Sequence, residues 1–495
     1  MGRKATKQQL DTIYKSMGEN ISSMYPSLLS VLELYRVLGS IDEQSEGKRF
    51  WMDLLRVDYF VLFCHLDIVT AIRAEQRAET VWEKRIHLKY LNVIQTEIFK
   101  AMFGFGKAKH CLWKKFCNNG INIDEKDRTE IDALVADYSG TFLHTDSKDR
   151  RDFAIHYDFD PIKVYDFLCR LSEEEEMKQV SKFLEICHKL LELVNKISTE
   201  VHLPLGMPQI QDYSLWERLN FFPDKDNQLL LKTKSSLNSY CKTLDSIANS
   251  YRLPEIVGKK FGAENIISHV QPIRESIHPG MLLLFIYIDI CCAVIAYFSS
   301  EHYIEKQLNL RHLNVIVYEG MKKMYGFKNS NTKGNNNNEK AQSAFWKDFL
   351  YPIIIGEGND DWRNRALVIE KQLETLAYDS SINDEDLRNM SVHIREKNDS
   401  DYIPRFTDKL IKMNPLVEMN KALKFLKILP DVMRLDQEVA NIRYTDIKRV
   451  QDQRNREMIN KLENIRNIVL QSCRDEEVKE SLNQSTEKLI SLLKM

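Results

Sequence analysis

The sequence has 495 residues, which is room for roughly two to four domains of ordinary size. Its formal net charge of −2 excludes a chain coated with basic residues for tight, unspecific binding to duplex nucleic acid. Only 17 glycines and 12 prolines punctuate the chain, too few for an all-β protein with frequent turns, so we expect an all-α fold of long helices.

The N-terminal segment, MGRKATKQQLD, lacks the apolar stretch of a signal peptide. The nine cysteines show no zinc-like spacing, which predicts buried free thiols in a reducing compartment and no metal or other cofactor. The segment Met281–Phe298 is apolar and long enough to cross a membrane, but Asp289 in its middle favours a buried core helix. We therefore expect a cytoplasmic protein without a membrane partner.

The first predicted helices occur twice along the chain. The apolar segment Phe60–Ile72, which contains Asp67, aligns with the segment around Asp289 at an offset of 222 residues. A repeated acid on an apolar helix is either a buried partner for an arginine or a structural hydrogen-bond hub. The same offset aligns Glu79–Phe105 with Glu301–Phe327 without a gap. Identical pairs in these two segments include Glu83/Glu305, Lys84/Lys306, Leu91/Leu313, Asn92/Asn314 and Glu97/Glu319.

Further matches complete the duplication. Glu176–Ile186 aligns with Glu418–Ile428 at an offset of 242, so the second copy carries insertions. One insertion is the polar, Asn-rich segment 329–342, which we expect to be a disordered loop. Apolar residues at three- and four-residue steps predict helices, and Gly104 and Gly326 stand where a helix C-cap is expected.

The duplication predicts two helical bundles packed as a pseudo-dimer within one chain. The expected boundaries are a first helical domain at 1–205, a linker at 206–234, a second helical domain at 235–432 and a C-terminal helical arm at 433–495. The arm is strongly charged with weakly heptad-like apolar spacing, which is typical of a surface for a protein partner.

A short motif lies between the matched blocks in each copy. Arg151 is followed five positions later by His156, and Arg388 is followed at the same spacing by His393. The offset between the two motifs is 237, between the values of the flanking blocks, so the motifs occupy equivalent places in the repeat. Chance produces such a spacing in a chain of this length, but does not readily produce it twice at equivalent positions.

This Arg-x4-His motif, repeated on predicted helical bundles, resembles the signature of the HEPN superfamily. The resemblance covers both repeats but not the C-terminal arm, and the apolar early helix is weakly similar to the abortive-infection branch. It implies a metal-independent ribonuclease in which two HEPN domains pair and two motifs share one cleft. Arg151, His156, Arg388 and His393 would be the catalytic residues, and the chain would act as a toxin or antiviral effector.

The residue types suit this chemistry. Cleaving RNA without a metal requires a base for the 2′-hydroxyl proton and an acid for the departing 5′ oxygen, and histidine can serve as either. Arginine offers a planar set of donors to the phosphoryl oxygens. On one helix, positions five apart point about 140° from each other. One motif therefore does not bring its own Arg and His together, whereas two facing motifs would.

Four further residues are candidates for a supporting role. Asp152 and Asn389 follow the motif arginines and either orient the motif side chains or cap a helix. Glu83 and Glu305 either lean into the cleft to position the arginines or are solvent-exposed helix charges. Candidate contacts to an RNA backbone are the lysines of the basic, aromatic segment KAKHCLWKKF, namely Lys107, Lys109, Lys114 and Lys115.

The motifs also allow an interpretation without catalysis. Their Arg and His side chains could pack the interface between the repeats, as in HEPN domains that serve as scaffolds. Of the two interpretations, the catalytic one predicts an endoribonuclease that cleaves unpaired RNA to 2′,3′-cyclic phosphate ends, and this is the function we expect. The alternatives are a non-catalytic helical adaptor and a regulatory half of a toxin system, which would bind a protein partner or inhibitor through the C-terminal helices.

Overall fold

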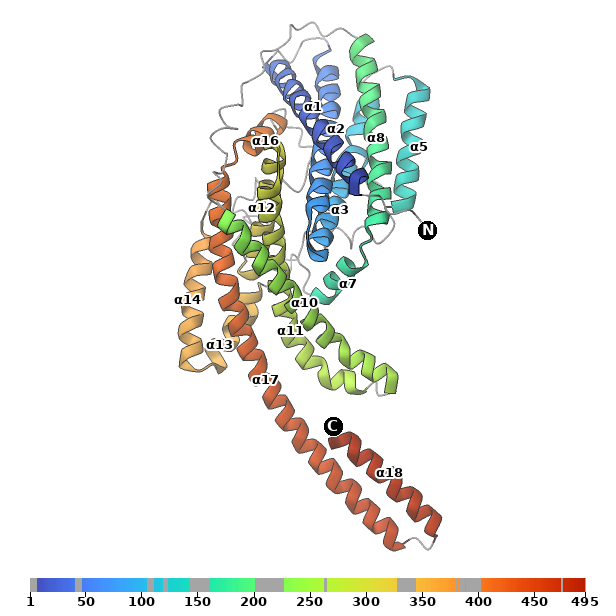
Figure 1. Ribbon diagram of the computed structural model, residues 1–495, viewed down its shortest axis with the longest axis vertical. Helices are drawn as coiled ribbons and strands as arrows, with labels where there is room; N and C mark the ends of the chain where they lie inside the picture. The colour runs from blue at the N-terminus through green and yellow to red at the C-terminus, as the bar shows by residue number, and fades with distance from the viewer. Residues whose placement is uncertain are drawn as a thin grey trace, which may run out of the picture.

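The computed structural model describes most of the chain. The described residues are 7–40, 47–104, 111–118, 123–142, 160–200, 227–261, 265–326, 344–379, 382, 388, 402–472 and 475–494. These ranges hold sixteen helices and no strand, which confirms the all-α fold (Figure 1). The Asn-rich segment 329–342 lies outside the described residues.

The first half contributes seven of these helices. They are α1 (Lys7–Ser40), α2 (Lys48–Arg77), α3 (Val81–Phe103), α4 (Leu112–Asn118), α5 (Glu125–Phe142), α7 (Pro161–Arg170) and α8 (Glu173–Glu200). Helix α2 is the central one, because it packs against α1, α3, α4 and α8.

The other nine elements belong to the second half. They are α10 (Asn227–Phe261), α11 (Asn265–Ser299), α12 (Tyr303–Met324), the π-helical turn η2 (Phe345–Leu350), α13 (Tyr351–Glu357), α14 (Asp360–Ala377), α16 (Tyr402–Ile411), α17 (Pro415–Ser472) and α18 (Glu476–Lys494). Helix α11 holds the central place here, against α10, α12 and α17.

The apolar segment of α11 is a core helix, as the sequence predicted. Gly280–Ser299 is long and apolar enough to span a membrane by length and composition, but 94% of it is buried within the protein. The cysteines fit the same picture. All eight in the described part of the chain are free thiols, six of them buried.

Equivalent helices end in the same way in both halves. Gly104 follows α3 with φ of 75°, and Gly326 lies just past α12 with φ of 78°. Residues with a β-carbon rarely adopt positive φ, and the Gly104 amide donates to the Lys100 carbonyl and caps the helix. The predicted helix ends are therefore confirmed at both positions.

Two hydrophobic cores form, and each half contributes residues to both. The core of the first half includes Ile304 and Leu308 from the start of α12, and the core of the second half includes Trp82 and Ile86 from the start of α3. An offset of 222 relates Trp82 to Ile304 and Ile86 to Leu308. The exchange is therefore reciprocal at aligned positions.

The short helices α7 and α16 are exchanged as well. From α7, Tyr165 and Leu168 are buried in the core of the second half, and from α16, Tyr402 and Phe406 are buried in the core of the first. Phe406 meets Phe63 of α2 edge to face, with ring centroids 5.2 Å apart. Each bundle is thus completed by a helix from the other.

Two of the expected domain boundaries, at 234 and 433, fall inside described helices. The expected linker at 206–234 overlaps α10, which begins at Asn227, because its apolar residues already pack on α11. The expected start of the arm at 433 lies within α17, which runs unbroken from the core to Ser472. Beyond the core, α17 pairs with α18 in a helical hairpin that projects from the body (Figure 1).

Candidate functional site at the contact between the halves

Two buried ion pairs join the halves. Arg311 on α12 donates to Asp67 on α2, and Lys89 on α3 donates to Asp289 on α11. An offset of 222 residues relates Asp67 to Asp289 and Lys89 to Arg311. The two pairs are therefore the same contact made in both directions, as in an interface between two copies related by a two-fold axis. In both pairs the repeated aspartate is the buried partner of a cation. The cation is arginine for Asp67 and lysine for Asp289.

The charges in this layer compensate one another. Burial alone would raise the pKa of Asp67, but the guanidinium of Arg311 and the ring of His312 hold it below its ordinary value. All four side chains of the two pairs are at most 3% exposed. A charge so deeply buried is tolerated only beside its partner, so these pairs fix how the halves dock.

A third pair of aligned positions meets at the middle of the contact. The ring of Tyr90 on α3 stacks on that of His312 on α12 with centroids 5.1 Å apart, and the offset is again 222. One turn before Tyr90 lies His87, whose pKa is lowered to about 3 by burial and by the nearby charges of His312, Arg77 and Lys89. His87 is therefore neutral at physiological pH.

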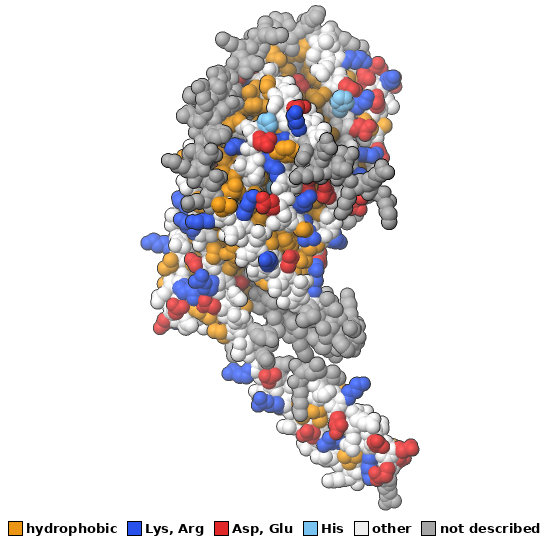
Figure 2. Space-filling model, in the orientation of Figure 1, with side chains coloured by type: hydrophobic (Ala, Val, Ile, Leu, Met, Phe, Trp, Pro, Cys, Tyr) orange, Lys and Arg blue, Asp and Glu red, His pale blue; other side chains and the backbone are white. Residues whose placement is uncertain are grey.

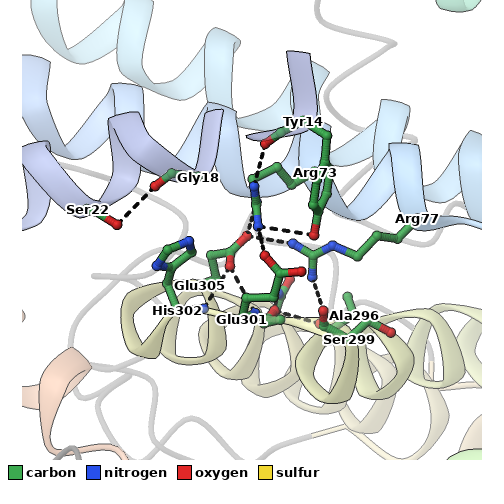
Figure 3. Close-up of polar contacts among 12 residues, drawn as sticks. Tyr14, Gly18, Ser22, Arg73, Arg77, Ala296, Ser299, Glu301, His302 and Glu305 are labelled. Carbon is green, nitrogen blue, oxygen red and sulfur yellow. Dashed lines mark hydrogen bonds and ion pairs between the residues drawn. The ribbon is translucent and has the colours of Figure 1, made fainter. Parts of the chain in front are cut away.

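A cluster of two arginines and a glutamate adds a one-sided contact (Figure 3). Arg73 and Arg77 of α2 each place a guanidinium nitrogen 2.7 Å from the same carboxylate oxygen of Glu305 on α12. The Arg73 guanidinium also lies over the ring of Tyr14, 3.9 Å from its centroid. Gly18 is required beside it, because a β-carbon there would lie 2.7 Å from a nitrogen of Arg73.

Among the described residues, this cluster has no counterpart in the other direction. The positions aligned with Arg73 and Arg77 are Ile295 and Ser299, which carry no charge. No described arginine of the other half pairs with Glu83, the residue aligned with Glu305. The Glu83 carboxylate accepts hydrogen bonds from the amides of Glu79 and Thr80, just before the helix begins, in a capping box with Thr80.

Of the two roles expected for Glu83 and Glu305, the solvent-exposed charge is wrong. Neither is a solvent-exposed charge, since their exposed fractions are 2% and 0%. Neither holds the one motif arginine that the structure describes, because both reach back to the start of their helix, where Glu305 accepts from the amide of His302. A glutamate at the third position of a helix favours this hydrogen bond to the backbone. In Glu305 the other carboxylate oxygen binds the two arginines of α2.

The motif arginine of the second half is held by another carboxylate. The Nε–H of Arg388 donates to Oε1 of Glu319 on α12 at 2.6 Å, and its Nη2 contacts the same oxygen. The guanidinium lies 5.9 Å from the centroid of the Tyr318 ring. Arg388 and Glu319 are both buried. Arg388 is thus anchored on a core helix of its own half.

The other predicted motif and RNA-binding residues are distributed as follows. Seven of them lie outside the described residues, namely Arg151, Asp152, His156, Asn389, His393, Lys107 and Lys109. Lys114 and Lys115 lie on α4, the first exposed and the second half-buried. On the face seen in Figure 2, basic and acidic side chains are interspersed.

Another matched contact lies inside each half. The Asn92 amide donates to Glu176 at 2.5 Å in the first half, and the Asn314 amide donates to Glu418 at 2.7 Å in the second. The sequence alignment pairs these residues at offsets of 222 and 242. Positions aligned from sequence alone therefore make the same buried hydrogen bond.

The sequence held a signal for Glu319 that the motif alone did not use. Glu97 and Glu319 are identical at the 222 offset, just as Glu83 and Glu305 are, so identity at this offset does not distinguish the two pairs as partners of an arginine. Glu97 is buried too. An acid repeated within an apolar helical stripe is the stronger sign of a buried partner for a cation.

Comparison with protein-family models, with curated proteins and with solved structures finds no match. The chemistry must therefore be argued from the residues themselves. Within the described ranges, no three His, Cys, Asp or Glu side chains group as a metal site. What the described geometry offers is a buried, carboxylate-held arginine and a symmetric contact that fixes the two halves against each other.

Proposed function

We propose that this chain is a metal-independent endoribonuclease whose two halves are fused HEPN-like domains sharing one composite site. The observation that carries the proposal is the Arg-x4-His motif, present at equivalent places of both repeats, with Arg388 held on a buried glutamate that is itself repeated. The reciprocal ion pairs support a fixed two-fold arrangement, which a composite site requires.

In the proposed reaction, one motif histidine takes the proton of the 2′-hydroxyl, whose oxygen attacks the adjacent phosphorus. The other histidine protonates the leaving 5′ oxygen, so the products carry a 2′,3′-cyclic phosphate and a 5′-hydroxyl. The motif arginines stabilise the extra negative charge on the phosphoryl oxygens in the transition state. Unpaired RNA is the expected substrate, because its nucleotides can adopt the in-line geometry. Such an activity fits a toxin or antiviral effector.

The test is incubation of the purified protein with total RNA in EDTA. We expect cleavage to 2′,3′-cyclic phosphate ends that is lost in both His156→Ala and His393→Ala, by a factor of about 100 or more. The control is Lys182→Ala, which removes an exposed surface ion pair with Asp137 and should leave the rate unchanged. Absence of cleavage with every RNA, together with absence of toxicity on expression, would refute the proposal.

One observation favours a second candidate, a non-catalytic adaptor. The hairpin of α17 and α18 projects from the body and exposes apolar side chains such as Ile465, Ile468 and Leu489. Exposed apolar residues on a projecting helical pair are typical of a protein-binding surface. Binding of a partner that needs residues 433–495, in a chain without nuclease activity, would support this candidate instead.

A further inference from the structure

The contact between Arg388 and Glu319 fixes the orientation of the guanidinium as well as burying it. A guanidinium is a planar group whose donors point in fixed directions, and one carboxylate oxygen of Glu319 engages both its Nε and its Nη2. Contact through two nitrogens fixes the plane of the group as well as its position, so Glu319 determines which edge Arg388 can present to a third group.

The place of Glu319 on its helix links it to the contact between the halves. Glu319 follows His312 by seven residues, which is close to two helical turns, so both side chains lie on the same face of α12. In the first half, Glu97 follows Tyr90 by the same seven residues on α3. Because Tyr90 and His312 stack on each other, each glutamate is tied by a rigid helix to the centre of the interface.

We infer that Glu319 is a positioning residue for Arg388, the motif arginine of its half, an inference that rests on the proposed function. The carboxylate holds the guanidinium in one orientation before RNA arrives. The Glu319 carboxylate also neutralises the buried charge of Arg388, which weakens the attraction of Arg388 for the phosphates of RNA in the ground state. The transition state carries more negative charge than bound RNA, so the fixed arginine favours the transition state over the ground state.

The decisive variant is Glu319→Gln, which keeps the side-chain volume and removes the charge. We expect kcat for RNA cleavage to fall roughly 10- to 100-fold while KM changes by less than about threefold, because binding relies on many contacts and the transition state relies on the oriented arginine. Glu319→Asp, which keeps the charge on a shorter side chain, should retain more activity than Glu319→Gln.

The matched control is Glu418→Gln. Glu418 is also buried in the second half, where its carboxylate accepts from Asn314 and pairs with Lys421. Its loss removes a buried charge without touching the motif. A purely structural role for Glu319 predicts that both variants lower the Tm and leave kcat unchanged below it. We expect a lower Tm in both and a lower kcat only in Glu319→Gln; equal kcat in the two variants would overturn the inference.

The same variants separate this inference from the proposed function. If the unmodified protein cuts no RNA in EDTA, the proposed function fails, and the positioning role fails with it. If the unmodified protein cuts RNA and Glu319→Gln cuts it equally fast, only the role of Glu319 fails. A double-mutant cycle of Glu319→Gln and Arg388→Gln in urea unfolding then tests the ion pair itself. Strong coupling without an effect on kcat would make Glu319 a structural partner.

Discussion

The two halves of the protein agree in their buried contacts and differ at the edge of their interface. Asp67–Arg311 and Lys89–Asp289 are one contact made twice, whereas Glu305 binds two arginines and its aligned residue Glu83 binds no arginine within the described part of the chain. The contacts repeated in both directions set the docking of the halves, as in a symmetric dimer. The one-sided cluster needs only one copy of its residues, which a single chain can carry in one half alone.

The largest effect is expected from separating the halves. Residues 1–226 and 227–495 produced as two polypeptides should each fail to unfold cooperatively in urea, and should regain a cooperative transition when mixed. Four apolar side chains of α7 alone, each worth about 1.5–3 kcal/mol, would be exposed, and this rivals the whole stability of an ordinary domain.

Circular dichroism in urea, with sedimentation to detect association, is the measurement for the separated halves. The intact chain cut between the same two residues after folding is the control, because it keeps the exchanged helices in place. A cooperative transition of either half by itself would show that the exchange of α7 and α16 is dispensable for folding.

The next largest effect is expected from the aligned glutamates Glu305 and Glu83, whose substitutions should differ in their effect on stability. Glu305→Gln should lower the free energy of unfolding by about 3 kcal/mol, because it leaves the buried guanidinium of Arg73 and the half-buried one of Arg77 without their shared carboxylate. Glu83→Gln should cost less than about 1 kcal/mol, because glutamine can still close a capping box. Urea unfolding of both variants measures the difference, and equal losses would mean that the arginine cluster adds nothing to stability.

The sequence predicted the all-α class of the fold from the period of its apolar residues. Apolar residues at three- and four-residue steps gave the helices, and the aligned glycines Gly104 and Gly326 gave two helix ends. The exchange of α7 and α16 was not predictable in this way, because an amphipathic helix shows that it must be buried but not which core buries it.

The site shows the same limit. The motif could be located from Arg388 and its repeat, but the choice of Glu319 over Glu305 as its partner depends on which face of α12 each glutamate occupies and what lies opposite. Both are buried acids on one helix, and only the tertiary arrangement assigns Arg388 to one and Arg73 to the other. Helical periodicity predicts which acids are buried, but it does not predict which arginine each acid binds.

The smallest effect concerns a histidine that only one half carries. His87 aligns with Asn309, and its folded pKa of about 3 lies well below the ordinary value of 6.5. Below pH 6.5 the unfolded chain binds a proton at this residue and the folded chain does not, so stability falls as the pH drops toward 3. The loss from His87 should be about 2 kcal/mol at pH 5.

His87→Asn brings the residue of the second half into the first and removes this titration. The variant should therefore lose about 2 kcal/mol less stability than the unmodified protein between pH 7 and pH 5. Urea unfolding at both pH values gives the difference, and any constant loss of packing cancels in the comparison. Parallel losses in the two proteins would mean that His87 is protonated in the folded state, and that the centre of the interface is more polar than its burial implies.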